Sequence, residues 1–408
     1  MKALILDPAL RSMGGHHYNA HLTLHRQLTE RRISVRTLGS AFADQSVTEV
    51  LGVVPTFTRS VYWRVDWTDA GFNNAVRQTN LELRRAQRWQ FPIVPTNLIV
   101  APCCDQVLAF ALAKYLVRGL GRRVPRILLW LLYAPDHNKA IDDPSILPLF
   151  KEYERAFEAL LTSIGDRTRL TVCCETAAMA KVYSTLLDVE IAVEPGPNLL
   201  TGSSLSRKER QEGNNLVTVV CVGFANQPKG YRLLPGAIER ILKIRNDVRF
   251  LIHGTVTGSD SEHDASAFQR LAEMGPRVVV NTSVLSQDEY LNWLKQGQIV
   301  LLPYDPQVYK TRGSGVFVEA KALGIPVVVT QGCNFALQAA EEGWAQYITN
   351  YSPDGVADAL GRAISSLPVM KARAEIAAND MQSQRPLGST LRSILDTLVA
   401  TERTNDYR

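Results

Sequence analysis

The chain has 408 residues, of which 46% are hydrophobic and 21% charged, with a net charge of +5. This composition is close to that of average soluble globular proteins and excludes disordered and collagen-like chains, while the charge is too small to indicate a nucleic-acid partner. Asp7 interrupts the apolar sequence that a signal peptide would need, and no apolar run reaches the roughly 20 residues that span a bilayer, so a cytoplasmic location is expected.

The N-terminal half alternates apolar strands with helices. Residues 2–7 ("KALILD") predict a strand, residues 8–19 a loop, residues 20–32 a helix and residues 33–40 a second strand. Further strands are predicted at 96–102, 126–134 and 169–175, and further helices at 104–120 and 176–187. Continuous apolar strands that alternate with helices indicate a parallel sheet covered on both faces.

The C-terminal half repeats this alternation after a polar, turn-rich segment. Strands are predicted at 216–224, 248–254, 277–281, 299–304 and 327–330, with helices at 231–244, 265–274 and 286–296 between them. We therefore expect an N-terminal domain at 1–200, a linker at 201–215, a C-terminal domain at 216–385, and a helix within 386–408 that returns to the N-terminal domain. Two doubly wound domains of this kind would face each other across a cleft at the carboxyl ends of their strands, where open α/β proteins bind ligands.

The segment "TRGSGVFVEAKALGIPVVVT" begins a helix with small residues and places one acid a turn later. The free N–H groups at Ser314 and Gly315, together with the helix dipole, suit a phosphate, and Arg312 stands beside this turn. Glu319 would repel a phosphate but suits the hydroxyls of a ribose. A structural turn with a surface glutamate is the alternative.

The same segment resembles retaining GT-B glycosyltransferases of the large family that uses nucleotide sugars, the family 4-like enzymes. Their signature is a pair of glutamates with seven residues between them, followed by A-x-x-x-G-x-P-V-V, and "EAKALGIPVV" has the second glutamate, Glu319. Thr311 stands where the first glutamate would be, which puts the identity of the donor sugar in doubt more than nucleotide binding.

A second motif carries the resemblance. In "VCVGFANQPKG", Gly223 and Lys229 match the family's G-R-x-x-x-x-K-G, while Phe224 replaces the arginine. An ammonium at Lys229 would neutralise the charge that grows on the leaving diphosphate. We infer that Arg312 supplies the charge lost at Phe224. The resemblance also implies donor contacts at Gly14, Gly15, Gly254, Val284 and Leu285.

Candidate acceptor residues lie in the N-terminal half. The resemblance implies that His16, in "SMGGHHYN", faces the acceptor, and that His137, after the strand at 126–134, bonds the transferred sugar as a catalytic residue beside Asp136. Trp63 and Arg64 belong to an aromatic, charged segment that suits a sugar or lipid-linked acceptor. For each of these residues, an ordinary structural loop is the alternative.

The resemblance implies a retaining glycosyltransferase that moves a sugar from a nucleotide diphosphate, UDP- or GDP-linked, to a hydroxyl of a glycan or lipid-linked acceptor. Lys229, Glu319 and His137 would be its catalytic residues, and no metal or other cofactor is expected. The basic segment "KYLVRGLGRRVPR" suits either contact with an anionic membrane face or a solvated helix surface. The alternatives are a GT-B-like binding protein without catalysis, and an epimerase or phosphorylase.

Overall fold

The computed structural model describes residues 1–13, 15–61, 69–90, 98–119, 124–132, 147–194, 216–256, 261–383 and 391–396. The chain divides into two compact units. Unit 1 consists of Met1–Leu199 together with Pro386–Arg408, and unit 2 consists of Leu200–Arg385. None of the described helices combines the length and the apolar character needed to cross a membrane.

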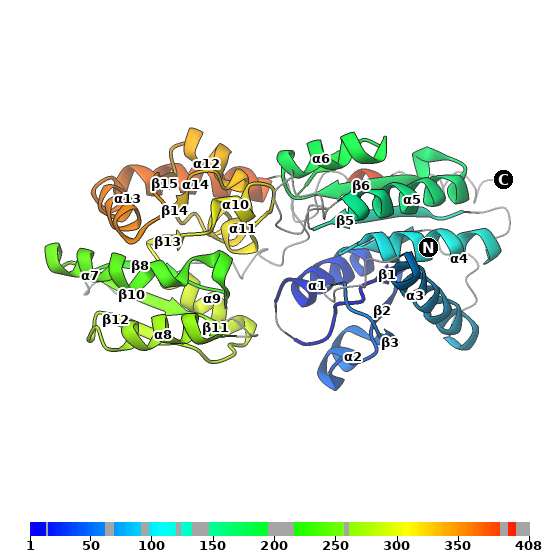
Figure 1. Cartoon of the computed structure of the whole chain (residues 1–408), viewed down its shortest axis with the longest axis horizontal. Helices are drawn as coiled ribbons and strands as arrows, with labels where there is room; N and C mark the ends of the chain where they lie inside the picture. The colour runs from blue at the N-terminus through cyan, green and yellow to red at the C-terminus, as the bar shows by residue number, and fades with distance from the viewer. Residues whose placement is uncertain are drawn as a thin grey trace. The chain divides into compact units, whose positions relative to one another are not determined.

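Unit 1 is built on a parallel sheet with the strand order β3-β2-β1-β4-β5-β6-β7, shown in blue to green in Figure 1. The strand order reverses direction at β1, so the ends of β1 and β4 form the topological switch point of this sheet. The strands are β1 (Lys2–Leu6), β2 (Ser34–Ser40), β3 (Val53–Phe57), β4 (Leu98–Ala101), β5 (Arg126–Leu131), β6 (Leu170–Cys174) and β7 (Ile191–Val193). The helices are α1 (Gly15–Glu30), α2 (Gln45–Leu51), α3 (Asp69–Gln90), α4 (Gln106–Gly119), α5 (Leu147–Ile164) and α6 (Ala177–Leu187).

Successive strand residues of unit 1 enter two different cores. Ile99 and Leu129 belong to the core that contains α3, α4, α5 and α6, whereas Val100 and Leu128 belong to a second core on the other face. Leu395, with its neighbours at 391 and 394, completes this second core. Both faces of the sheet are therefore covered, which explains why its strands are continuously apolar.

Unit 2 has the strand order β12-β10-β8-β13-β14-β15, again all parallel, with its switch point between β8 and β13. A short two-stranded ribbon joins β9 (Phe224–Ala225) to β11 (Thr255–Val256). The sheet strands are β8 (Val217–Cys221), β10 (Val248–His253), β12 (Val278–Asn281), β13 (Ile299–Leu302), β14 (Val327–Thr330) and β15 (Ala345–Ile348). The helices are α7 (Leu234–Ile244), α8 (Ser261–Ala272), α9 (Gln287–Gln296), α10 (Pro306–Tyr309), α11 (Gly315–Ala322), α12 (Leu337–Glu341), α13 (Pro353–Ser365) and α14 (Leu367–Ser383).

The sheet of unit 2 also divides its side chains between two cores. Val219 and Leu301 pack with α7 and α13, and Val220 and Val300 pack with α9 and α11 on the opposite face. The α7 helix contacts α13, and α11 contacts α14. The predicted α/β class with two doubly wound sheets is therefore confirmed.

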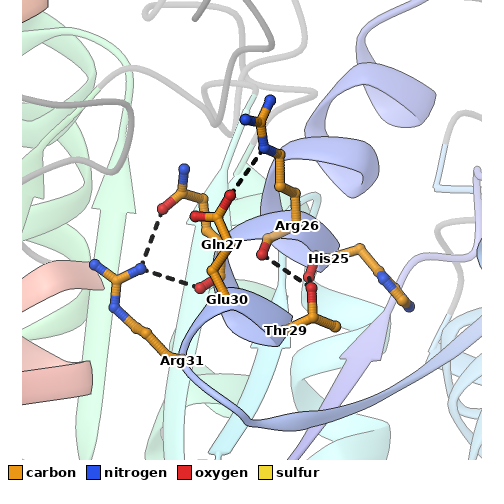
Figure 2. Close-up of polar contacts among 6 residues, drawn as sticks. All are labelled: His25, Arg26, Gln27, Thr29, Glu30 and Arg31. Atoms are coloured by element: carbon orange, nitrogen blue, oxygen red, sulfur yellow. Dashed lines mark hydrogen bonds and ion pairs between the residues drawn. The ribbon is translucent and has the colours of Figure 1, made fainter.

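Helix α1 leads away from the switch point of unit 1 and ends in local hydrogen bonds, which Figure 2 shows. The Thr29 hydroxyl lies 2.8 Å from the His25 carbonyl oxygen, the Arg31 guanidinium donates to Gln27, and Arg26 pairs with Glu30 at 2.9 Å. Carbonyls near the end of α1 thus find side-chain partners on the helix itself and on Arg31, the residue that follows it. This end of α1 is structural.

One helix boundary differs from the sequence predictions. Helix α1 starts at Gly15 rather than at residue 20, because a polar first turn has no apolar period to reveal it. Helix α3 was not predicted from the sequence, and its first turns, Asp69 to Asn74, belong to the aromatic, charged segment for which a structural loop was the alternative. Helix α9 begins with a capping box formed by Ser286 and Glu289.

Candidate functional site

The loops that follow β8 and β13 are joined at the switch point of unit 2. The amide of Asp305 donates to the carbonyl of Pro228 over 2.8 Å. Gly230 has a φ of +71°, and a Cβ there would lie only 1.9 Å from the carbonyl oxygen of Pro303. This close backbone approach fixes one loop against the other and requires a glycine.

Lys229 lies in this junction, at the end of the 3₁₀ turn Gln227–Lys229. Its Nζ is 5.6 Å from the centroid of the Tyr304 ring. It also lies 2.6 Å from the position that a Cβ on Gly223 would occupy. Burial lowers the pKa of Lys229, while Cys221 and Glu319 act in the opposite direction. The ammonium therefore lies beside Gly223, just after the end of β8.

The start of α11 is open, as the sequence predicted. Gly315 is exposed, and the space that a side chain would fill there is empty. Ser314 is the N-cap residue, and its hydroxyl accepts a hydrogen bond of 3.2 Å from the Phe317 amide. Ser314 thus satisfies one of the first-turn N–H groups itself, which leaves the backbone N–H groups at Gly315 and Val316 as the groups that suit an anion.

Glu319 lies one turn further along α11 and is only 8% exposed. The hydroxyl of Tyr290, on α9, donates a short hydrogen bond to its Oε2. Burial raises the pKa of Glu319 to about 7, against the opposing effects of the Tyr290 hydrogen bond and the Lys229 charge. Glu319 therefore changes charge in the physiological pH range.

The turn after β12 is held by polar contacts and presents an apolar side chain. Asn281 Oδ1 accepts from the amide and the hydroxyl of Ser283, and the carbonyl of Ser283 lies 2.9 Å from His253 Nε2. Val284, the next residue, is 81% exposed, and Leu285 is partly buried. A rigid turn with an exposed apolar tip suits the flat face of a nucleobase.

Phe224 is the second exposed apolar side chain in this region, at 52%. It pairs with Thr255 in the β9–β11 ribbon, and the Thr255 hydroxyl donates to the same Ser283 carbonyl over 3.4 Å. Gly254 is explained differently, since a Cβ there would lie 2.4 Å from Phe268 Cζ. Core packing is thus a sufficient reason for this glycine.

Unit 1 contains a polar cluster that the sequence analysis missed. Asp7 follows β1 at the switch point and is fully buried. Its Oδ2 accepts hydrogen bonds from His17 Nδ1 at 2.7 Å and from His21 Nε2 at 3.0 Å, and its Oδ1 accepts from the Ala9 amide. Burial raises the pKa of Asp7, but the charges and hydrogen bonds of the two histidines outweigh burial and hold that pKa well below its usual range.

A sequence signal for this cluster existed. His17, His21 and His25 are spaced four residues apart, which places them on one side of a helix, and an acid directly follows the first strand. A helix that is predicted to begin at residue 20 leaves His17 in a loop, which hides this signal. The predicted site therefore does not include Asp7.

Several predicted residues cannot be compared with the structure. Gly14, Trp63, Arg64, Asp136 and His137 lie outside the described residues. Gly15 and His16 begin α1, although the described part does not extend to the His16 side chain. Arg312 is half-buried beside the start of α11.

Within the described residues, no three histidine, cysteine or acidic side chains are grouped in a way that could hold a metal ion. The six cysteines are buried and free. Cys173 and Cys174 enter the two opposite cores of unit 1, as expected for packing residues.

One segment of the C-terminal half is similar to a known protein family. Residues 217–366 match the family model described as glycosyl transferases group 1. This segment contains Lys229, Tyr290 and Glu319. None of the curated protein sequences compared with the chain matches it.

Solved structures share the fold of the whole chain at low sequence identity. Sucrose-phosphate synthase from Thermosynechococcus elongatus is 10% identical with a TM-score of 0.66, over 100% of this chain and 99% of the other. Anabaena HepE, solved with UDP and glucose, is 16% identical with a TM-score of 0.59, over 99% and 100%. A putative UDP-N-acetylglucosamine 2-epimerase from Listeria monocytogenes is 12% identical with a TM-score of 0.52, over 93% and 94%. The chain thus has the GT-B fold, with one Rossmann-like domain in each unit.

Proposed function

We propose, from the match of residues 217–366 to the family model of group 1 glycosyl transferases, that this chain transfers a sugar from a nucleoside diphosphate to a hydroxyl acceptor. The observation that carries the proposal is the arrangement at the switch point of unit 2. An ammonium at Lys229, an open helix start at Gly315 and an acid at Glu319 lie on the loops and the helix that follow β8 and β13.

The three groups match three parts of one ligand. The N–H groups at the start of α11 and the Lys229 ammonium suit the two phosphates, because both present positive charge. Glu319 suits the ribose, since an ionised carboxylate accepts hydrogen bonds from hydroxyls. The exposed Val284 and Phe224 suit the base. UDP- or GDP-linked sugars are the proposed donors, and a glycan or lipid-linked sugar is the proposed acceptor.

Departure of the diphosphate is the step that these residues assist. The bond between the anomeric carbon and the phosphate oxygen breaks, and negative charge grows on that oxygen while Lys229 and the helix start stabilise it. We propose front-face retention, in which the leaving phosphate takes the proton of the acceptor hydroxyl as the new bond forms. His137, carried over from the family resemblance, would position the transferred sugar. No metal or other cofactor is part of this mechanism.

The proposal extends to location. The chain would act in the cytoplasm, with an acceptor at the inner face of a membrane. The basic residues from Lys114 to Arg126 motivate this part of the proposal. Vesicles with and without anionic lipid would test it: sedimentation with anionic vesicles alone is expected, and equal sedimentation with neutral vesicles would contradict it.

A thermal-shift panel of UDP, GDP, ADP, CMP and dTDP, with their sugar conjugates, tests the donor site. One nucleotide is expected to raise the melting temperature by several degrees, and Lys229→Ala and Glu319→Ala are expected to abolish the rise. Lys243→Ala, which removes an exposed lysine of α7, is the matched control and should leave the rise intact. The absence of a shift with every nucleotide at millimolar concentration would contradict the donor site.

A binding protein without catalysis is the second candidate. Thr311 replaces the family's first glutamate and is buried, and Phe224 replaces its arginine. Such a protein would give the thermal shift but neither hydrolyse nor transfer the sugar over hours. An epimerase would instead change the sugar while it stays attached to the nucleotide, and NMR of the incubated donor separates these outcomes.

A further inference from the structure

The contact between Tyr290 and Glu319 joins two helices of unit 2. Tyr290 lies in the first turn of α9, and Glu319 in the second turn of α11, 29 residues later. The Tyr290 hydroxyl donates to Oε2 of Glu319, and no hydrogen bond to Oε1 occurs among the described residues. One oxygen of the carboxylate is thus fixed, and the other stays available as an acceptor.

Tyr290 is itself held by the turn that precedes α9. Its neighbour Glu289 closes the capping box, accepting from the Ser286 amide at 2.8 Å and from the Ser286 hydroxyl at 2.6 Å. The same turn contains Ser283, which His253 contacts at 2.9 Å. The exposed Val284 lies between these two anchored positions. The segment that suits the base is therefore rigidly connected to the hydroxyl that holds the acid.

We propose that Tyr290 is a positioning residue for the nucleotide: its hydroxyl holds Glu319 so that the second carboxylate oxygen accepts hydrogen bonds from the ribose hydroxyls. The inference rests on the proposed function. It adds that the base-binding turn and the ribose-binding acid act as one unit, because a single side chain at the start of α9 connects them.

The charges around Glu319 define how this contact depends on pH. Lys229 approaches it from the loop after β8, and Tyr290 from α9. On α11 itself, Lys321 is two residues away. From α14, Glu375 lies 3.4 Å from the position that a Cβ on Gly324 would occupy, beyond the far end of α11. Because Tyr290 donates a hydrogen bond to the ionised form, its removal would raise the pKa of Glu319 above about 7.

The test is Tyr290→Phe, which keeps the ring that packs beside Leu291 and removes only the hydroxyl. Calorimetry would measure the Kd of whichever nucleotide of the panel binds, alongside its 2′,3′-dideoxy analogue, from pH 6 to pH 9. Both ligands carry the same phosphates, so their ratio of Kd values cancels the titration of the phosphate and isolates the ribose contact.

In the wild type, the ribose hydroxyls are expected to contribute about tenfold in affinity above pH 7, and less as the pH falls and Glu319 takes up a proton. In Tyr290→Phe, the contribution is expected to fall to about threefold or less at pH 7 and to return only at higher pH. Glu319→Gln should abolish it at every pH. Tyr347→Phe, a matched change on β15 with no hydrogen bond from its hydroxyl among the described residues, should behave as the wild type.

The outcomes separate this inference from the function on which it rests. If the wild type binds a nucleotide and Tyr290→Phe shows the same ratio and the same pH profile, Tyr290 is only a packing residue and the inference is overturned. If the wild type binds no nucleotide of the panel, the proposed function fails and this inference fails with it.

Discussion

Gly223 shows how a residue without a side chain can define a charged site. Its φ is +132°, and the Lys229 ammonium lies against its backbone. A methyl group there would meet Nζ at 2.6 Å, and Nζ is the end of a flexible chain that can move away. A side chain at this position would therefore displace the Lys229 ammonium and would also destabilise the fold.

Gly223→Ala is accordingly expected to weaken nucleotide binding about tenfold, with a stability loss of about 1 to 2 kcal/mol from the unfavourable φ. Calorimetry and urea unfolding would measure the two effects. Gly275→Ala is the matched control, since Gly275 has a φ of +88° and open space around it. The control should lose stability and keep its affinity, and an equal loss of affinity in both variants would contradict the role of Gly223.

Asp7 carries a buried charge that is paired with His17 and His21. Asp7→Asn is expected to destabilise unit 1 by about 3 kcal/mol at pH 7, since it leaves polar partners buried without their acceptor. The folded pKa of Asp7 is depressed, so its contribution to stability is full above its unfolded value of about 3.8 and is lost as the pH falls below that value.

Urea unfolding between pH 3 and pH 7 would measure this effect. The stability of the wild type should fall more steeply below pH 4 than that of Asp7→Asn, and parallel curves would count against the proposed pairing. Asp188→Asn is the control, because its carboxylate is exposed and lies 3.5 Å from the Arg167 guanidinium.

At the residue scale, motif spacing singled out Lys229 and Glu319 as candidates for the donor site, and their roles there stay predictions. Motif spacing does not indicate the neighbours of these two residues. Tyr290 could not be found in this way, since its contact joins residues 29 positions apart and depends on how two helices pack. His17 was missed for a local reason, the unrecognised first turn of α1.

Helix α11 is the element on which the phosphate site depends. Ser314→Ala removes the side chain that caps the Phe317 amide and is expected to cost about 1 kcal/mol of stability. It should also weaken nucleotide binding several-fold, because the first turn that presents its N–H groups would fray.

Ser352→Ala is the matched change for this prediction, since Ser352 caps α13 through the Gly355 amide at 3.1 Å. A similar stability loss with unchanged affinity is expected for it. If neither variant alters affinity, the start of α11 has no role in nucleotide binding. Thermal unfolding with and without nucleotide would provide both numbers.

The elements themselves were predicted well where strands are buried on both faces. The strands β8, β10 and β14 contain continuous apolar runs, which are typical of strands in a parallel sheet that is buried on both faces. Polar or mixed elements were harder: α3 carries many charged residues and was not recognised, and β15 ("AQYI") is too short and only partly buried to stand out. The apolar pattern in the sequence reflects burial, so elements that are partly exposed have a weaker pattern and are harder to predict.

On the scale of the whole molecule, the core of unit 1 depends on residues far along the chain. Leu391 and Leu395 pack into the face that also contains Ile5 and Leu128. Leu391→Ala with Leu395→Ala is expected to destabilise unit 1 by several kcal/mol, because each change leaves a cavity in a buried core. Unit 2, which is one continuous segment, should be unaffected.

Scanning calorimetry would detect this as a lower melting temperature for the transition of unit 1 alone. Leu337→Ala removes a leucine of unit 2 that is 47% exposed and should leave both transitions nearly unchanged. A uniform decrease of both transitions in the double variant would mean that the units do not unfold separately.

This late contribution to the first core also has a consequence for biosynthesis. On the ribosome, residues 1–199 emerge first, yet the side chains that complete their second core emerge only after all of unit 2. Unit 2 can therefore reach its final packing while unit 1 still exposes an apolar face. During translation, unit 1 would therefore stay incompletely packed until its last residues are synthesised, and it would be the unit that a chaperone binds.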